Sequence, residues 1–278
     1  MLKLIAVLIS IITINYNDVA GLKKTMTSVL GQTYPYIEYI VIDGGSTDGS
    51  KEYIEQHKEQ LAYWISEPDS GIYNAMNKGI DKARGEYLLF LNGGDYLYKT
   101  EIIEKVSKLL LGGKDLYYGN LLLDRNGNFV EAKYPESLSF SYFYYRGHLP
   151  HPATFIKRNL FSRVYKFKEE FKIVGDYDFL VCAVCKHNAS YEHFDEFVTV
   201  YDTTGISGNP EYRALLLSER KRSLQSNFPL FTADAERLLR NETMLKTKRF
   251  KLLSNLEGKP RAEKMNNYWL KLLTKIFQ

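Results

Sequence analysis

Acidic side chains follow glycine-rich or apolar segments at several points, and each can bind a cation or accept a proton. Asp95 closes the segment Asn-Gly-Gly-Asp at residues 92–95, where Gly93 and Gly94 allow the backbone to approach a ligand closely. A carboxylate in such a segment suits Mg²⁺ or Mn²⁺ shared with substrate phosphates. Gly-Gly-Asp is also common in ordinary turns, where the aspartate only caps the backbone, so both interpretations stay open.

Asp43 opens a second polar segment, DGGSTDG, at residues 43–49. Its carboxylate can accept a hydrogen bond from a ligand, or it can form an Asx turn ahead of a helix. The glycines do not have the G-x-G-x-x-G order of dinucleotide-binding loops, and no Gly-Lys-Ser/Thr follows as in a P-loop. The segment therefore predicts neither of these two nucleotide-binding motifs.

Asp176 and Asp178 stand at the start of an apolar helix in the sequence VGDYDF. One of them can act as a general base that projects into a cleft, or both can stabilise the helix N-terminus. His151 lies between two prolines in LPHPA. It can contact a phosphate or an acceptor, or it can be a loop histidine with satisfied hydrogen bonds.

Strands and helices are expected to alternate over the first 120 residues. The expected strands cover 4–14, 39–42, 62–65 and 87–91; the expected helices cover 19–30, 50–60 and 72–83, with another that begins near Thr100. Continuously apolar strands that alternate with helices predict an α/β fold with a mostly parallel sheet covered on both faces. Asn15, Asp43 and Asp95 each follow a strand, and ligands of such sheets bind beyond the carboxyl ends of the strands.

The pattern changes after residue 115. Residues 124–128, DRNGN, predict a hairpin turn, and the chain up to about 205 has a mixed α+β pattern. We expect one domain over 1–210, with a nucleotide-binding half at 1–115 and an acceptor half at 116–210. Residues 211–278 are expected to form a helical extension.

The formal charge is unevenly distributed along the chain. The net charge is +4, and residues 211–278 carry 15 basic and 7 acidic side chains. A basic extension indicates an anionic neighbour such as a membrane surface, or simply solvated surface helices. The aromatic and lysine-rich residues 267–277 can lie on an anionic membrane, or pack on the core or a partner subunit. No nucleic acid is expected as a partner, because only the charge of the extension favours one.

Two further features bear on the compartment. Cys182 and Cys185 are too few for a disulfide scaffold, which indicates a reducing compartment, and their helical spacing in an apolar run predicts two buried thiols. Residues 1–14 are apolar but show no cleavage site and are too short and β-branched for a membrane span. We therefore expect a buried strand there and a cytoplasmic protein.

Four motifs together resemble family 2 glycosyltransferases, in order and in spacing. These are SIITINYN at 10–17, YIVIDGGSTDGS at 39–50, EPDSGIYNAMNKGI at 67–80 and the strand from 85 to 95. The third is similar to the segment in the branch that includes colanic-acid-type polysaccharide enzymes. The resemblance implies a GT-A fold, a nucleoside-diphosphate-sugar donor and inversion at the anomeric carbon.

The resemblance also implies roles for individual residues. Asp43 would bind the base, Asp95 the metal that bridges the diphosphate, and Asp176 would be the catalytic base. The other residues implied in donor binding are Thr13, Asn15, Asp69, Asn77, Gly94 and His151. Two positions depart from the family pattern: Gly94 replaces a carboxylate that often contacts the ribose, and Gly175 replaces a glutamate, which keeps Asp178 as an alternative to Asp176.

The resemblance thus implies an inverting enzyme that uses Mn²⁺ or Mg²⁺. The expected donor is a UDP-sugar, and the expected acceptor is a glycan or a lipid-linked sugar in cell-surface polysaccharide synthesis. Peripheral membrane binding and a homo-oligomer are both compatible with the extension. A non-catalytic nucleotide-sugar-binding protein and a nucleotidyltransferase are the alternatives. A nucleotidyltransferase usually has a glycine-rich basic first loop, and residues 15–18, NYND, do not match it.

Overall fold

The computed structural model describes residues 6–125, 127–145, 147–206 and 208–276. The chain divides into two compact units, Met1–Asn227 and Phe228–Gln278. The first unit continues past residue 210, where the sequence places the domain boundary, because helix α8 (Arg213–Asn227) belongs to it. Leu4 and Ile5 of the expected first strand lie outside the described residues, as does Asn126 of the expected hairpin turn.

Within the described residues, nine strands form one mixed sheet in the order β3-β2-β1-β4-β8-β6-β9-β5, with β7 paired to β6. Strand β1 pairs in parallel with β2 and β4, and β2 with β3, while β8 runs antiparallel to β4 and β6. The predicted α/β class is confirmed. The strands are β1 (Ile9–Asn15), β2 (Ile37–Asp43), β3 (Tyr63–Ser66), β4 (Tyr87–Asn92), β5 (Tyr96–Leu97), β6 (Leu116–Arg125), β7 (Asn128–Ala132), β8 (Thr154–Lys157) and β9 (Tyr191–Asp202).

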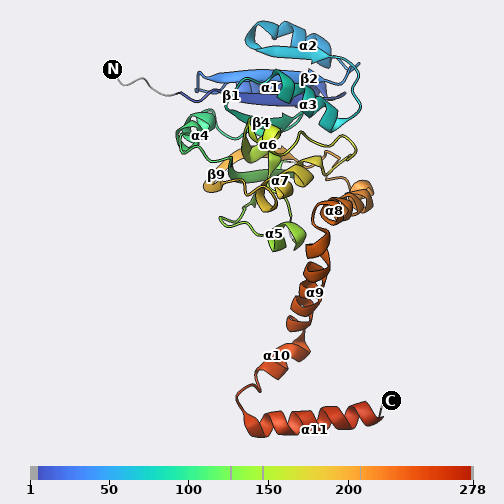
Figure 1. The fold of residues 1–278 in the computed structure, drawn as a ribbon. Helices are drawn as coiled ribbons and strands as arrows, with labels where there is room; N and C mark the ends of the chain where they lie inside the picture. Colours follow the sequence, from blue (N-terminus) through green and yellow to red (C-terminus); the bar gives the residue numbers. More distant parts are fainter. Residues whose placement is uncertain (1–5, 126, 146, 207, 277–278) are drawn as a thin grey trace. The chain divides into compact units, whose positions relative to one another are not determined.

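The helices follow the expected segments closely over the first 110 residues (Figure 1). Those of the first unit are α1 (Val19–Leu30), α2 (Ser50–Gln56), α3 (Ile72–Lys82), α4 (Ile102–Leu110), α5 (Phe140–Tyr145), α6 (Leu160–Arg163), α7 (Gly175–Cys185) and α8. The second unit contains α9 (Pro229–Leu245), α10 (Lys248–Ser254) and α11 (Pro260–Ile276), so its predicted helical character is confirmed. No helix in the described ranges is long and apolar enough to cross a membrane.

Alternate residues of the central strands pack against different helices, as the period of two of a β-strand requires. Ile9 and Ile11 join the core cluster that contains Leu22 and Met26 of α1. Ile12 faces α3, where a Cβ added at Gly79 would lie 2.4 Å from the Ile12 Cγ2 atom. Glycine at this position therefore allows α3 to approach β1 closely.

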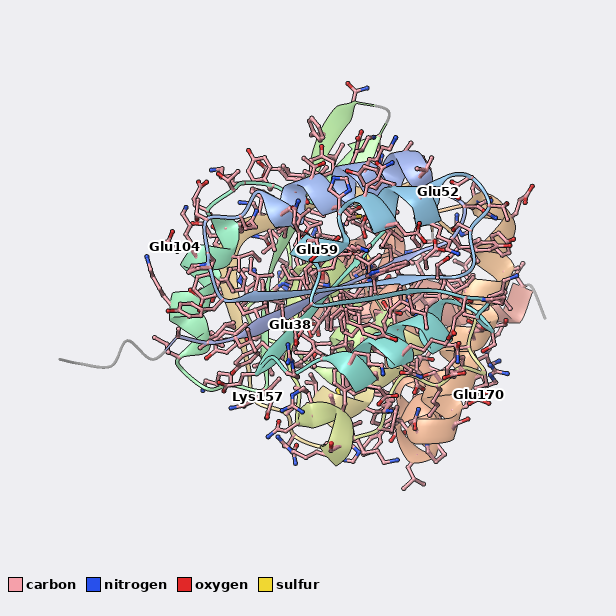
Figure 2. All side chains as sticks on the ribbon, turned by 90° about the horizontal axis from the view of Figure 1, so that it is seen from above. Glu38, Glu52, Glu59, Glu104, Lys157 and Glu170 are labelled. Atoms are coloured by element: carbon pink, nitrogen blue, oxygen red, sulfur yellow. The ribbon has the colours of Figure 1, made fainter. Side chains whose placement is uncertain are left out.

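The amino ends of β1 and β2 carry a buried polar cluster. Ser10 donates to Glu38 over 2.6 Å, and the Arg84 Nε donates to the same carboxylate over 2.6 Å. Figure 2 labels Glu38 among the strands, with Glu104 and Glu170 toward the edges of the view. This cluster links β1 and β2 at the edge of the sheet opposite to the edge that carries Asn15 and Asp43.

The two cysteines are free thiols, and burial raises the pKa of each to about 11. The prediction of a buried thiol is correct for Cys182. It is wrong for Cys185, which is only partly buried because it occupies the last position of α7.

Candidate active site

Polar side chains meet at the carboxyl ends of β1 and β2. Asn15 and Asp43 are register partners, and the Asn15 Nδ2 donates to the Asp43 Oδ1 over 2.9 Å. Ser46 and Ser66 also donate to Asp43, through Oγ atoms 2.5 and 2.6 Å away. Burial raises the pKa of Asp43, but these hydrogen bonds outweigh it and hold the pKa below its ordinary value. Asp43 is thus an ionised carboxylate that orders the turn after β2.

The residues implied in donor binding do not all reach this edge. A Cβ at Gly44 would lie 2.7 Å from the Asp69 Oδ2, so Asp69 lies beside the turn after β2. Thr13 is fully buried, and its hydroxyl is 3.0 Å from that of Tyr39. The Asn77 Nδ2 donates to the Phe167 carbonyl over 2.8 Å and therefore holds a loop. The structure brings Asp69 to Asn15 and Asp43, but not Thr13 or Asn77.

The turn at residues 92–95 follows β4. Gly94 has a φ of +100°, a conformation that favours glycine. Asp95 is 2% exposed, and its two carboxylate oxygens accept from the backbone N–H groups of Asn92 (3.2 Å) and Asp202 (3.0 Å). Burial raises the pKa of Asp95 to about 7, against the attraction of His151. Asp95 is therefore a buried carboxylate whose charge a cation would stabilise.

Asp176 lies in the wall of a cavity of about 310 Å³ between α3, α7 and the second half of the sheet. The Tyr73 hydroxyl donates to its Oδ1 over 2.8 Å, and the His151 Nδ1 lies 3.3 Å from its Oδ2. Burial raises the pKa of Asp176, but the hydrogen bonds and charge of His151 and the Tyr73 hydroxyl bring it below the ordinary value. The cavity therefore has an ionised, oriented carboxylate in its wall.

His151 lies between Asp176 and the 92–95 turn. Its Nδ1 faces Asp176, and its Nε2 is 3.4 Å from the Asn92 Nδ2. This arrangement fits the tautomer in which Nδ1–H donates to Asp176 and Nε2 accepts from Asn92. Burial lowers the pKa of His151, but Asp176 and Asp95 raise it above the ordinary value overall. The imidazole thus connects the two carboxylates of the site.

Asp178 has a different environment, although it is only two residues from Asp176. It is fully buried and accepts from Ser223 over 2.6 Å, from Asn227 over 2.8 Å and from Tyr165 over 2.8 Å, with the Lys168 ammonium 3.0 Å away. These contacts attach α8 to α7. Asp178 does not line the cavity, so the geometry favours Asp176 as the carboxylate that meets a substrate.

Most of the cavity wall is apolar or aromatic. The residues that surround Asp176 and His151 include Met76, Leu121, Leu123, Tyr134, Ile173, Tyr177, Tyr201 and Leu216. Arg220 of α8 also belongs to this lining, and its guanidinium stacks on Tyr177 at 4.5 Å from the ring centroid. The cavity thus combines a largely apolar surface with one carboxylate and one guanidinium.

Three residues of the site, Tyr73, Arg220 and Asp202, were not predicted from the sequence. Tyr73 lies within the motif at 67–80, so that motif was a usable signal. Arg220 is one of many basic residues in 211–278, and Asp202 ends an ordinary strand pattern. Neither residue carries a local signal that separates it from its neighbours.

The described part of the chain contains no group of three or more His, Cys, Asp or Glu side chains that could hold a metal ion. The 92–95 turn nevertheless offers oxygen ligands. The Asn15 Oδ1 and Asn92 Oδ1 are buried and make no hydrogen bond to described residues, and the buried Asp95 carboxylate lies in the same turn as Asn92. Mg²⁺ and Mn²⁺ prefer oxygen ligands and usually share them with substrate phosphates. The residues present therefore fit a divalent cation that is completed by a bound diphosphate.

The curled α/β sheet with helices on it and a C-terminal helical extension defines a GT-A-fold protein of the glycosyltransferase class. The chain belongs to glycosyl transferase family 2, whose sequence profile matches residues 10–171. An uncharacterized glycosyltransferase of Mycobacterium tuberculosis is 34% identical over 220 residues, which cover 74% of this chain and 79% of that protein. A PGL/p-HBAD biosynthesis glycosyltransferase of Mycobacterium bovis is 29% identical over 63% of this chain and 68% of that protein.

Solved structures show the same fold at low sequence identity. S. aureus TarS 1-349 in complex with UDP-GlcNAc aligns with a TM-score of 0.62 and 20% identity over 83% of this chain and 70% of that one. The mannosyltransferase PcManGT from Pyrobaculum calidifontis, in complex with GDP-Man and Mn²⁺, aligns with a TM-score of 0.55 and 14% identity over 96% and 88%. These likenesses confirm the predicted fold.

Proposed function

We propose that this glycosyltransferase is an inverting, metal-dependent enzyme that transfers a sugar from a UDP-sugar to an acceptor hydroxyl in the cavity. The observation that carries the proposal is the Asp176 carboxylate, held by Tyr73 and His151 in the cavity wall. An oriented, ionised carboxylate next to a substrate-sized cavity has the properties of a general base.

The reaction is a single displacement. Asp176 accepts the proton of the acceptor hydroxyl as that oxygen forms a bond to the anomeric carbon, and the bond from this carbon to the diphosphate oxygen breaks. Tyr73 and His151 hold the two carboxylate oxygens of Asp176, so the base is oriented before the acceptor arrives. One displacement inverts the anomeric centre without a covalent intermediate.

Asp95, with the unpaired amide oxygen of Asn92, would hold the divalent cation at the diphosphate. The cation, Mn²⁺ or Mg²⁺, would neutralise the negative charge that develops on the leaving diphosphate. Asp43, Asn15 and Asp69 lie at the neighbouring strand ends, where parallel sheets bind nucleotides, and we assign the base and ribose to them. The UDP and UDP-GlcNAc complexes of TarS support a UDP-sugar donor.

The acceptor is inferred from the cavity lining. Apolar and aromatic side chains surround Asp176, a surface that favours an acceptor with an apolar part, such as a lipid-linked or deoxygenated sugar. The relative named for PGL/p-HBAD biosynthesis and the motif at 67–80 support a role in cell-surface glycan synthesis of the colanic-acid type.

A donor panel tests this function. Thermal shift and UDP release are measured with UDP- and GDP-sugars, each with and without Mn²⁺, and a stabilising, Mn²⁺-dependent response to one UDP-sugar is expected. The Asp176→Asn variant should keep that thermal shift and lose UDP release. Binding without hydrolysis or transfer by the wild type would instead indicate a non-catalytic nucleotide-sugar-binding protein, and a response limited to nucleoside triphosphates a nucleotidyltransferase.

We also propose that α11 binds an anionic membrane surface from the cytoplasmic side. None of its described residues is buried, and Tyr268, Trp269 and Ile276 are all more than half exposed. Met265, Trp269 and Ile276 share one helical face, and Lys264, Lys271 and Lys275 add positive charge. The full chain should sediment with phosphatidylglycerol vesicles, and the Lys271→Glu/Lys275→Glu variant should not. Equal sedimentation of both would contradict the role of these lysines in membrane binding, and a dimer in solution without vesicle binding would show that α11 packs on a second copy instead.

A further inference from the structure

The end of β9 lies over the 92–95 turn. Strand β5 begins one residue after Asp95 and pairs antiparallel with β9, so that Tyr96 is the register partner of Val200. This pairing brings Asp202, the last residue of β9, to Asp95, and the Asp202 backbone N–H donates to the Asp95 Oδ1 over 3.0 Å. The two carboxylate-bearing residues are therefore held together by backbone structure.

The Asp202 carboxylate occupies the space that a side chain at position 94 would fill. A Cβ added at Gly94 would lie 2.7 Å from the Asp202 Oδ2 and 3.2 Å from its Cβ. The other oxygen, Oδ1, accepts from the Thr204 N–H over 2.8 Å and from the Thr204 hydroxyl over 2.7 Å. The side chain is thus anchored through one oxygen while the second oxygen lies directly over Gly94.

A separate observation indicates that a ligand belongs at this turn. Asn15 is 6% exposed, and its Oδ1 lies 2.8 Å from the position of a Cβ at Gly93 without a hydrogen-bond partner in the described residues. The Asn92 Oδ1 is likewise buried and unpartnered. Buried polar atoms are normally paired, so two unpaired amide oxygens at one turn require an explanation.

We propose that Asp202 is the second carboxylate of the cation site at the donor diphosphate, acting together with Asp95. Divalent cations at phosphates are commonly held by one or two protein carboxylates, with phosphate and water oxygens as the remaining ligands. Gly94 leaves room for the Asp202 carboxylate, and the unpaired Asn15 and Asn92 oxygens would supply the neutral oxygen ligands of the site. The proposal rests on the proposed function, because it takes the cation to be the one that accompanies a nucleotide diphosphate.

The segment that follows Asp202 belongs to the cavity wall. Thr203 and Ile206, which follow Asp202, both line the cavity next to Asp176. A cation bound by both Asp202 and Asp95 would therefore hold this segment of the cavity wall against the 92–95 turn. Donor binding and the shape of the acceptor cavity are coupled through a single loop.

The Asp202→Asn substitution tests the proposal in the full-length protein. Asparagine can still accept both hydrogen bonds from Thr204, and the backbone contact to Asp95 does not depend on the side chain. UDP binding is measured by titration calorimetry with and without Mn²⁺, and bound Mn²⁺ is counted by EPR. We expect UDP binding without metal to be unchanged. The gain in UDP affinity that Mn²⁺ causes should be smaller than in the wild type by about tenfold or more.

Glu196→Gln is the matched control, because Glu196 is a half-exposed acid of the same strand that pairs with Lys105 at 3.3 Å. It should show the wild-type gain from Mn²⁺. If Asp202→Asn also shows the wild-type gain while Asp95→Asn loses it, the role of Asp202 is overturned and the proposed function stands. If the wild-type protein gains no UDP affinity from Mn²⁺, both proposals fail.

Discussion

Asp176 and Asp178 begin the same helix, α7, yet only one of their carboxylates reaches the cavity. The Asp176 side chain is held by Tyr73 and His151 in the cavity wall, whereas Asp178 is fully buried against Ser223 and Asn227 of α8. Because an α-helix has 3.6 residues per turn, side chains two positions apart point to roughly opposite sides, and Ser223 and Asn227 of α8 pack on the side that carries Asp178. The two aspartates therefore have separable roles, one chemical and one structural.

Asp176→Asn should abolish sugar transfer while the protein still binds UDP. Asparagine retains the shape of the side chain but cannot accept a proton, and general-base catalysis contributes about 10²- to 10⁴-fold to a rate. The rate is followed by UDP release and the affinity by calorimetry. Transfer at the wild-type rate would remove Asp176 from the role of base.

Asp178→Asn should instead lower stability. The substitution weakens the charge-assisted hydrogen bonds from Ser223 and Asn227 and removes the ion pair with Lys168, with a cost of about 2 kcal/mol in the free energy of unfolding. Urea denaturation measures this cost, and the transfer rate of the folded fraction should stay close to wild type. Wild-type stability with lost transfer would reverse the two assignments.

Gly94→Ala should destabilise the turn and displace the Asp202 side chain. The φ of +100° is unfavourable for alanine, and its Cβ would lie 2.7 Å from the Asp202 Oδ2. Backbone strain of this kind costs about 1–3 kcal/mol. Gly49→Ala is the control, since Gly49 has a φ of +96° but open space around it. Thermal denaturation should show a loss for both variants, while Mn²⁺-dependent UDP binding falls only for Gly94→Ala.

Glu38→Gln should remove part of the acid sensitivity of the fold. Burial raises the pKa of Glu38, but the hydrogen bonds from Ser10 and Arg84 outweigh it, so the folded-state pKa lies below the ordinary 4.5. A lowered pKa contributes stability that is present above the unfolded-state value and is lost as the pH falls through the folded-state value.

The difference in unfolding free energy between wild type and Glu38→Gln should therefore be largest near neutral pH and shrink below about pH 4.5. Urea denaturation over a pH series measures it. Glu104→Gln, a substitution of a half-exposed acid on α4, is the control for the loss of one charge. A difference that is constant over the series would contradict the prediction.

Arg220→Met should weaken acceptor binding and leave donor binding unchanged. The Arg220 Nη2 donates to the carbonyl oxygens of Phe143 (2.8 Å) and Gly147 (3.3 Å), and the guanidinium stacks on Tyr177 in the cavity wall. Methionine retains much of the apolar volume but none of the hydrogen bonds. We expect a higher KM for the acceptor with an unchanged Kd for UDP. An equal loss of both would indicate a general folding defect.

Much of the first half of the molecule was predictable from local pattern. The apolar runs and the polar segments between them predicted β1, α1, β2, α3 and β4, and the structure has each of these elements. The meeting of Asn15 and Asp43 was also predictable, because adjacent parallel strands end at the same edge of the sheet.

The contacts that individual side chains of these elements make were not predictable in the same way. Thr13 and Asn15 are two residues apart on β1, yet Thr13 is fully buried against Tyr39 while Asn15 reaches the strand-end edge. Asn77 lies in a family motif, but its amide holds the loop at Phe167. A motif shows that a residue belongs to a segment, and the packing around that segment decides what the side chain contacts.

The sequence by itself determined the fold class, the positions of the strand ends and the aspartates that follow them, since these depend on periodicity and turn residues within about ten positions. Only the tertiary structure distinguished the role of Asp176 from that of Asp178. It also brought Asp202 to Asp95, which is 107 positions away in the sequence. The physical reason is that α8 and β9 return to the site through long-range packing. Contacts of that kind depend on the packing of the whole core and leave no local pattern in the sequence.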